Sequence, residues 1–164
     1  MVPARFKKVA VGGTFDRLHR GHLRLLEKAF DVGEDVIIGL MTDELVKRYP
    51  KEHRIASYLY RRRQLLHCLR ALGNVSRAKI VPLNDIYGPT TTDGSIEALV
   101  VSRETESRGR EINDQRVAKG LKPLTIVVVE MVLADDRVPI NTTRIKRREI
   151  DREGHLLHIQ SRTS

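Results

Sequence analysis

Apolar residues follow two alternating patterns along the chain. Short runs rich in β-branched side chains predict strands over residues 6–11, 35–41, 78–83, 98–102 and 124–129. Apolar residues at helical spacing predict helices over 22–32 and 58–72, and residues 43–48 predict a short helical segment that Pro50 ends. A polar, helix-compatible stretch covers 104–119, and a last helix is predicted over 141–150, with Asn141 or Thr142 as its cap. Strands that alternate with helices are typical of an α/β domain with a mainly parallel sheet.

The length of 164 residues suits one domain. We therefore predict a single Rossmann-like domain over residues 1–164, with helices on both faces of the sheet and a core over about 6–150. The run at 124–129 is almost continuously apolar, which predicts a parallel strand buried on both faces. Residues 154–164 have little to bury, so a loose tail is expected there.

Ligands of parallel α/β sheets bind beyond the carboxyl ends of the strands, where the strand order reverses. The segments that leave the predicted strands at that edge are 12–22, 42–53, 84–95, 102–110 and 130–143. Residues that carry the chemistry are therefore expected in these five segments.

The formal net charge of +9 favours anionic partners, either nucleic acid or a small polyphosphate. The chain has three Phe, four Tyr and no Trp, and no basic–aromatic platform for stacking bases is visible. A nucleic-acid partner is therefore not expected. Two tracts, 61–63 and 147–148, consist of arginine alone and are interpreted as solvated faces of helices.

Cysteine usage and hydropathy narrow the class of protein further. The single cysteine, Cys68, lies among leucines and is interpreted as a core residue rather than a nucleophile. No apolar run approaches the roughly 20 residues of a membrane span. Residues 1–5 lead straight into the first predicted strand without the apolar stretch of a signal peptide, so we interpret the protein as cytoplasmic.

The strongest chemical signal is the sequence GGTFDRLHRGH over residues 12–22, between the first strand and the first helix. Gly12 and Gly13 let the backbone approach a ligand closely. His19 and His22 are three residues apart, so they share a face of the helix and can donate hydrogen bonds to phosphate near its positive end. A capped turn with incidental histidines is one alternative. A metal-binding pair is another, but no further ligand lies nearby, and no metal site formed by the protein itself is predicted.

These eleven residues are neither a P-loop nor a dinucleotide fingerprint. They resemble the G-x-F-D-x-x-H-x-G-H signature of the nucleotidylyltransferase superfamily. Residues 140–146, INTTRIK, resemble that superfamily's I-S-S-T-x-I-R element, with Asn141 and Thr142 in place of the serines and Lys146 in place of the arginine. The resemblance implies an ATP site, and the residues that it assigns to ATP are Gly12, Gly13, Phe15, His19, Arg103, Thr142 and Thr143.

Two further stretches, LNDIYGPTTTD over 83–93 and VVSRET over 100–105, are similar to the phosphopantetheine adenylyltransferases of archaea and the matching domain of eukaryotic CoA synthases. The resemblance runs from about residue 8 to 150. It implies transfer of the adenylyl group of ATP to 4′-phosphopantetheine, giving dephospho-CoA and pyrophosphate in coenzyme A biosynthesis. The first motif alone also permits a sister enzyme that uses CTP, or ATP with a flavin or nicotinamide mononucleotide. The oligomeric state is left open.

The resemblance also implies roles. Thr14 would position the acceptor phosphate, while His22 and Lys47 would hold the α-phosphoryl oxygens during catalysis. Lys51, four residues further along the same segment, is the reserve candidate for Lys47. Mg²⁺ would accompany ATP, Arg103 or Arg108 would contact the triphosphate, and the residues expected to bind the acceptor are Thr14, Asp85, Ile86 and Tyr87.

Overall fold

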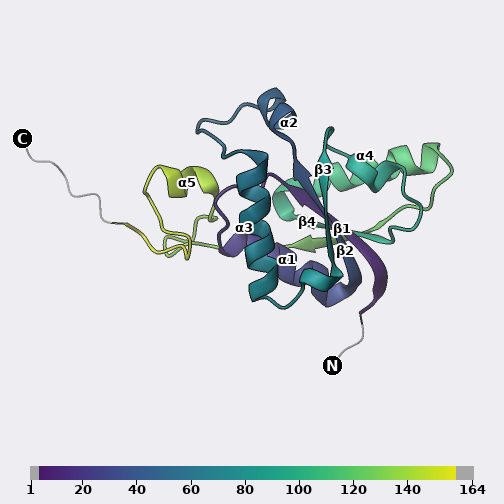
Figure 1. Ribbon diagram of the computed structural model, residues 1–164, viewed down its shortest axis with the longest axis horizontal. Coiled ribbons are helices and arrows are strands. Elements are labelled where there is room, and N and C mark those ends of the chain that lie inside the picture. Colours follow the sequence, from purple (N-terminus) through teal and green to yellow (C-terminus); the bar gives the residue numbers. More distant parts are fainter. Residues whose placement is uncertain (1–3, 158–164) are drawn as a thin grey trace, which may run out of the picture.

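The computed structural model describes residues 4–157. Its centre is a five-stranded sheet in the order β3-β2-β1-β4-β5, and every neighbouring pair is parallel (Figure 1). The order reverses between β1 and β4, so the ligand edge lies at their carboxyl ends. The predicted parallel α/β fold is confirmed, and the strands are β1 (Phe6–Gly13), β2 (Gly33–Met41), β3 (Ala78–Leu83), β4 (Ala98–Ser102) and β5 (Thr125–Val129).

Helices cover both faces of the sheet, as predicted. On one face, α1 (Arg20–Val32) and α3 (Tyr58–Ala71) bury leucines against the strands, among them Leu26 and Leu65. On the other face, α4 (Glu106–Ala118) packs Ile112 against Leu99. The remaining helices are α2 (Asp43–Arg48) and α5 (Thr142–Lys146), and the short 3₁₀ turns are η1 (Val75–Arg77), η2 (Gly88–Thr91) and η3 (Arg103–Thr105). Among the described residues, no helix is long and apolar enough to cross a membrane.

The strand β5 differs from its prediction. Thr125 is exposed and Val127 is only partly buried, so the strand is not buried on both faces. The reason is its position, because β5 is an edge strand that pairs with β4 alone. A run of β-branched residues indicates a strand, but it does not indicate whether a second neighbour covers it.

The last predicted helix is also wrong in its extent. Asn141 caps α5 as predicted, its side chain accepting from Arg144 N. The helix ends at Lys146, and Arg148 has a positive φ of 58° that turns the chain back. The Arg144 side chain folds onto Asp136 and Glu149 instead of projecting into solvent. These ion pairs hold a compact turn where the sequence pattern predicted four more residues of helix.

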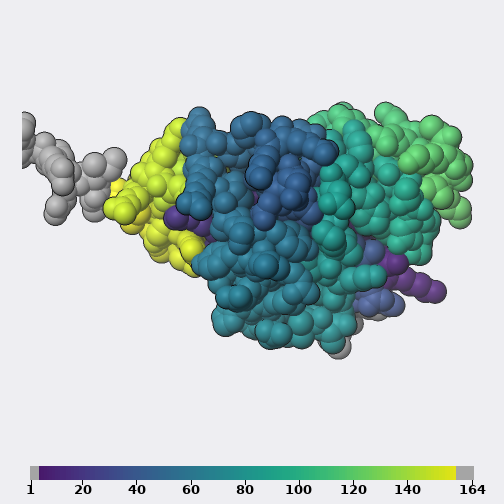
Figure 2. Space-filling model, turned by 45° about the horizontal axis from the view of Figure 1, so that its top comes forward, coloured from purple at the N-terminus to yellow at the C-terminus, as the bar shows by residue number. Residues whose placement is uncertain are grey.

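The loose tail predicted from residue 154 is wrong for residues 154–157, and residues 158–164 lie outside the described part. Gly154 is buried, its carbonyl accepts from Asp135 N at 2.9 Å, and Leu156 bridges to Ile150. A small apolar cluster of Ala134, Ile140, Ile145 and Ile150 forms beneath it. Residues 130–157 thus form a lobe at one end of the molecule, coloured mostly yellow in Figures 1 and 2. Lys146 and Arg147 of this lobe contact Arg54 O and Glu52 of the loop after α2.

Candidate active site

The turn after β1 has an unusual backbone. Phe15 and Arg17 both have positive φ, 50° and 47°, in a region that side chains rarely adopt. Asp16 lies between them and is buried, where its Oδ2 pairs with Lys146 Nζ at 2.8 Å. Strained backbone of this kind is common at functional sites. The Asp16–Lys146 pair joins the first sequence motif to the second across the site.

The side chain of Phe15 corrects one prediction. It was assigned to ATP, but it is 2% exposed and belongs to the core beneath the turn. Its ring lies 5.5 Å from that of His22, centroid to centroid. The Phe15 side chain therefore packs in the core behind the site, next to the His22 ring.

The two histidines build the start of α1. His19 is the N-cap, and its Nδ1 accepts from Gly21 N at 3.0 Å. His22 Nδ1 accepts from His19 N at 3.3 Å, and the rings stack with centroids 3.9 Å apart. A Cβ on Gly21 would lie 2.8 Å from His19 Cε1, so only glycine permits this close approach. Because each Nδ1 is an acceptor, each imidazole carries its proton on Nε2, free to donate elsewhere.

The environment keeps both imidazoles neutral. Burial, together with the neighbouring His19 and Lys51, lowers the pKa of His22 to about 3. Burial and the charge of Arg152 lower the pKa of His19 to about 4. Removing a charged imidazole from water is costly, so both stay uncharged at neutral pH. Each therefore offers one N–H to a ligand without a titration step.

Both histidines line what we call the polar pocket, a cavity of about 340 Å³. The pocket also receives Thr142 and Thr143 from the start of α5, as the second motif predicts. Thr142 Oγ1 donates to Asp16 O at 2.9 Å, and Thr143 Oγ1 lies 3.3 Å from His53 Nδ1. The two motifs, about 120 residues apart in sequence, therefore meet at one polar pocket, whose other polar lining residues include Lys51, His53, Ser102, Glu104 and Glu130.

The structure brings Lys51, and not Lys47, to the polar pocket. Lys47 lies on α2 with its side chain exposed, and it is not among the residues that line the polar pocket. Lys51 lines the pocket, and its charge contributes to the low pKa of His22. The helical segment over 43–48 was predicted correctly, but it carries Lys47 outward, and the chain returns to the site after Pro50.

His53 is a pocket residue that the sequence did not single out. It lines the polar pocket, and its Nε2 is buried without a hydrogen-bond partner in the part of the chain that the structure describes. The only sequence signal was its place in the 42–53 segment at the ligand edge.

Arg103 was assigned to ATP, and it lies beside the polar pocket without being one of its lining residues. Its guanidinium pairs with Glu106 at 3.2 Å and with Glu130, and hydrogen bonds to these carboxylates raise its pKa. The other candidate, Arg108, lines a second cavity. Both arginines follow β4 closely in sequence, Arg103 in the turn η3 and Arg108 in α4, and only Arg108 lines the second cavity.

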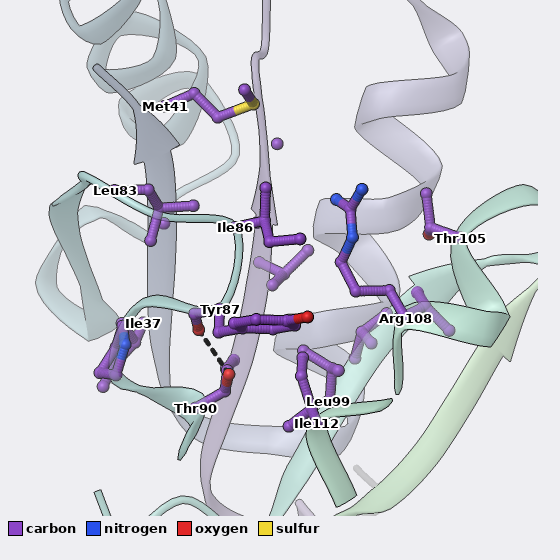
Figure 3. A pocket seen from close by; sticks show the side chains of 18 of the residues that line it. Ile37, Met41, Leu83, Ile86, Tyr87, Thr90, Leu99, Thr105, Arg108 and Ile112 are labelled. Carbon is purple, nitrogen blue, oxygen red and sulfur yellow. Dashed lines mark hydrogen bonds between the residues drawn. The ribbon is translucent and has the colours of Figure 1, made fainter. Parts of the chain in front are cut away.

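The second cavity, the apolar pocket, has a volume of about 80 Å³. Figure 3 shows the Tyr87 ring lying across it, with Ile86, Leu99 and Ile112 nearby and the Arg108 guanidinium beside it. Ile86 and Tyr87 are thus brought to a pocket as predicted. Asp85 is not among the lining residues; its Oδ1 accepts from Tyr87 N and Gly88 N and holds the turn.

Gly12 and Gly13, which the resemblance assigns to ATP, line the apolar pocket. Leu25 lines both cavities, so the two pockets are neighbours at the carboxyl end of β1. Thr14 follows directly, and its Oγ1 donates to Met41 Sδ at 3.3 Å at the end of β2. Thr14 is therefore held between the two strand ends from which the site segments leave.

The loop that carries Tyr87 is tied down from α4 by a buried arginine. Arg116 is 1% exposed and donates to the carbonyl oxygens of Thr90, Asp93 and Ile96. Thr90 in turn donates to Tyr87 O, the bond drawn in Figure 3. The amino-acid pattern does not predict this contact, because a lone arginine on a polar helix is usually solvated.

Comparisons with known proteins agree with this geometry. The cytidylyltransferase-like family matches residues 10–148. A phosphopantetheine adenylyltransferase of Methanothermobacter thermautotrophicus is 46% identical over 93% of this chain and 91% of its own length. The enzyme of that name from Pyrococcus horikoshii is 43% identical over 92% and 95%.

Solved structures share the fold. A protein of unknown function from Archaeoglobus fulgidus has a TM-score of 0.66 and 31% identity over 74% of this chain and 88% of its own. A bifunctional NMN adenylyltransferase/ADP ribose pyrophosphatase from Francisella tularensis has a TM-score of 0.57 at 14% identity, covering 87% of this chain and 41% of its own. By its motifs, its two neighbouring pockets and its extensive identity with these enzymes, the chain belongs to the cytidylyltransferase-like family and, within it, to the archaeal phosphopantetheine adenylyltransferases.

Proposed function

We propose that this protein transfers the adenylyl group of ATP to 4′-phosphopantetheine, giving dephospho-CoA and pyrophosphate in the biosynthesis of coenzyme A. The observation that carries the proposal is the pair of adjoining pockets beyond β1. The polar pocket offers two neutral imidazoles, a lysine and helix-terminal threonines, which suit a triphosphate. The narrow apolar pocket with Tyr87 suits the thin pantetheine arm. The names of relatives 42–46% identical support the same reaction.

The reaction requires alignment and charge neutralisation more than proton transfer. The acceptor phosphate is largely a dianion at neutral pH because its second pKa is about 6. One of its oxygens forms a bond to the α-phosphorus while the bond from that phosphorus to the β-phosphate oxygen breaks, and the leaving group is pyrophosphate. Thr14 would hold the acceptor phosphate, while His22 Nε2–H and Lys51 would stabilise the charge on the α-phosphoryl oxygens. His19 Nε2–H would bind the α- or β-phosphate.

Magnesium is proposed to enter with the nucleotide. Among the described residues, no group of three or more His, Cys, Asp or Glu side chains could hold a metal ion by itself. The ion needs few protein ligands, because phosphate oxygens and water complete most of its coordination. Glu104 lines the polar pocket and would hold the ion there. The bound ion would neutralise part of the negative charge of the phosphates.

The function is tested with a panel of nucleotides and acceptors. Pyrophosphate release should require 4′-phosphopantetheine, and ATP should clearly exceed CTP. Flavin and nicotinamide mononucleotide carry broad rings that the apolar pocket does not suit, so they should be poor acceptors. Equal or greater turnover with CTP or with either mononucleotide would overturn the assignment to coenzyme A biosynthesis and leave a nucleotidylyltransferase of another specificity.

Tyr87→Ala should raise the KM for 4′-phosphopantetheine while barely changing the KM for ATP. The Tyr87 ring lies in the apolar pocket. Removing a fully packed aromatic side chain commonly costs about 3 kcal/mol or more. Tyr87 is only half-buried, so we expect about half of that cost, which corresponds to roughly a tenfold rise in KM. Tyr87→Phe serves as the matched control. The hydroxyl that it removes makes only a long, exposed hydrogen bond to Glu111, at 3.4 Å, so both KM values should stay close to wild type. An effect on the KM for ATP alone would place the loop on the nucleotide side.

A further inference from the structure

Arg61 is the residue on α3 that departs furthest from its sequence prediction. The tract 61–63 was expected to be a solvated basic face, and Arg62 and Arg63 are indeed exposed. The Arg61 side chain is 0% exposed. Burying a guanidinium is costly unless each donor finds a partner. The contacts that compensate this cost therefore show what the residue holds together.

The guanidinium is hydrogen-bonded on all three of its nitrogen atoms. Nε donates to Ala56 O at 2.8 Å, and Nη1 donates to Thr14 O at 2.9 Å and to Met41 O at 2.8 Å. Nη2 pairs with Asp43 Oδ1 at 3.2 Å. Only one of the four partners is a carboxylate, and it is nearly half exposed. Most of the compensation comes from backbone carbonyls, whose positions the arginine fixes in return.

These carbonyls belong to the segments that form the reaction site. Thr14 is the proposed acceptor-phosphate residue, and Met41 receives its hydroxyl hydrogen bond. Met41 and Ala56 lie at the two ends of the stretch that carries Lys51 and His53. Asp43 Oδ1 also accepts from Tyr58 N, which ties the start of α2 to the start of α3.

The stretch between α2 and α3 depends on such ties. Residues 49–57 contain no helix or strand, and most of their side chains are exposed. Few apolar contacts hold a segment of this kind, so its hydrogen bonds largely determine where Lys51 lies. Residues 52–54 are tied to α5 and its C-cap, and Arg61 holds the carbonyl oxygens of Met41 and Ala56 on either side of the segment. Arg61 connects the end of that segment to Thr14 through a single rigid planar group.

We propose that Arg61 is a positioning residue for adenylyl transfer, one that sets the distance between the acceptor phosphate at Thr14 and the α-phosphate at Lys51. It acts through backbone carbonyls and contacts neither substrate. The inference rests on the proposed function. An error of about 1 Å between reacting groups can lower a rate by about 100-fold, so the arginine has a large effect from a distance.

The test compares Arg61→Met, Arg61→Lys and the exposed control Arg62→Met. The melting temperature, kcat and both KM values are measured for each variant and the wild type. The folded Arg61→Met protein should lose about 10- to 100-fold in kcat and show a raised KM for 4′-phosphopantetheine with a nearly unchanged KM for ATP. Arg61→Lys keeps the charge and part of the hydrogen bonding, so it should recover part of kcat. Arg62→Met should match the wild type.

Two results would overturn the proposal. One is a folded Arg61→Met protein whose kcat and both KM values lie within twofold of wild type. The other is a loss of activity that follows the unfolded fraction alone. If Arg61→Met does not fold, Arg61→Lys decides, and wild-type kinetics in that variant reject the proposal. Failure of the wild type to form dephospho-CoA would instead reject the proposed function, and the variants would then be compared with the acceptor that it does use.

Discussion

His22→Ala is expected to lower kcat by about 100- to 1000-fold, the usual effect of removing one preorganised donor to a developing negative charge. The imidazole is fixed by its Nδ1 contact with His19 N, so its Nε2–H can face the polar pocket. Charge on the α-phosphoryl oxygens grows in the transition state, so kcat should fall more than the affinity for ATP. Steady-state kinetics with varied ATP measure both quantities.

Thermal unfolding provides the control for that variant. His22 also closes a capping box with His19, so a loss of about 1 kcal/mol of stability is expected from the cap. The exposed His67 on α3 supplies the matched substitution, and His67→Ala should change neither kcat nor the melting temperature.

Because the pKa values of His19 and His22 lie near 4 and 3, their titration should not affect the rate between about pH 5 and 8. If His22→Ala lowers the melting temperature but keeps the wild-type kcat, His22 is a helix-capping residue and not a catalytic one.

Lys51→Ala is expected to lower kcat by about 100-fold, because it removes a second donor, here a positively charged one, from the α-phosphoryl oxygens. Lys47→Ala is the matched control and should remain within about twofold of wild type, as expected for an exposed side chain outside the site. This reverses the order that the sequence register suggested. Lys51→Arg should restore part of the rate, since it keeps the charge. A large loss of kcat in Lys47→Ala, together with wild-type kcat in Lys51→Ala, would show that the loop after α2 takes another position during catalysis.

The parts of the fold that the sequence predicted well depend on local patterns. The alternation of β-branched runs with helical spacing located all five strands, and glycine, histidine and threonine at helix starts located the two motifs of the polar pocket. These signals are carried by residues close together in sequence, where backbone and side-chain preferences act directly. The short α5 escaped the pattern because the contacts of Arg144 with Asp136 and Glu149 depend on the fold of the whole lobe.

The errors in the site have the same origin. Phe15 belongs to the motif, but a motif does not show which of its side chains face the ligand and which face the core. Arg61 and Arg116 resemble surface arginines in sequence, and only the folded chain surrounds each with carbonyl oxygens from distant segments. Lys51 and Lys47 are four residues apart, so the direction of one short helix decides which of them reaches the pocket.

The central claim is tested most directly by identifying both products of one reaction. The purified protein is incubated with Mg-ATP and 4′-phosphopantetheine, and dephospho-CoA is quantified by mass spectrometry beside a pyrophosphate assay. Adenylyl transfer predicts dephospho-CoA and pyrophosphate in equal amounts, with neither formed when 4′-phosphopantetheine is left out. Pyrophosphate release without dephospho-CoA, or the same release in the absence of the acceptor, would contradict the account.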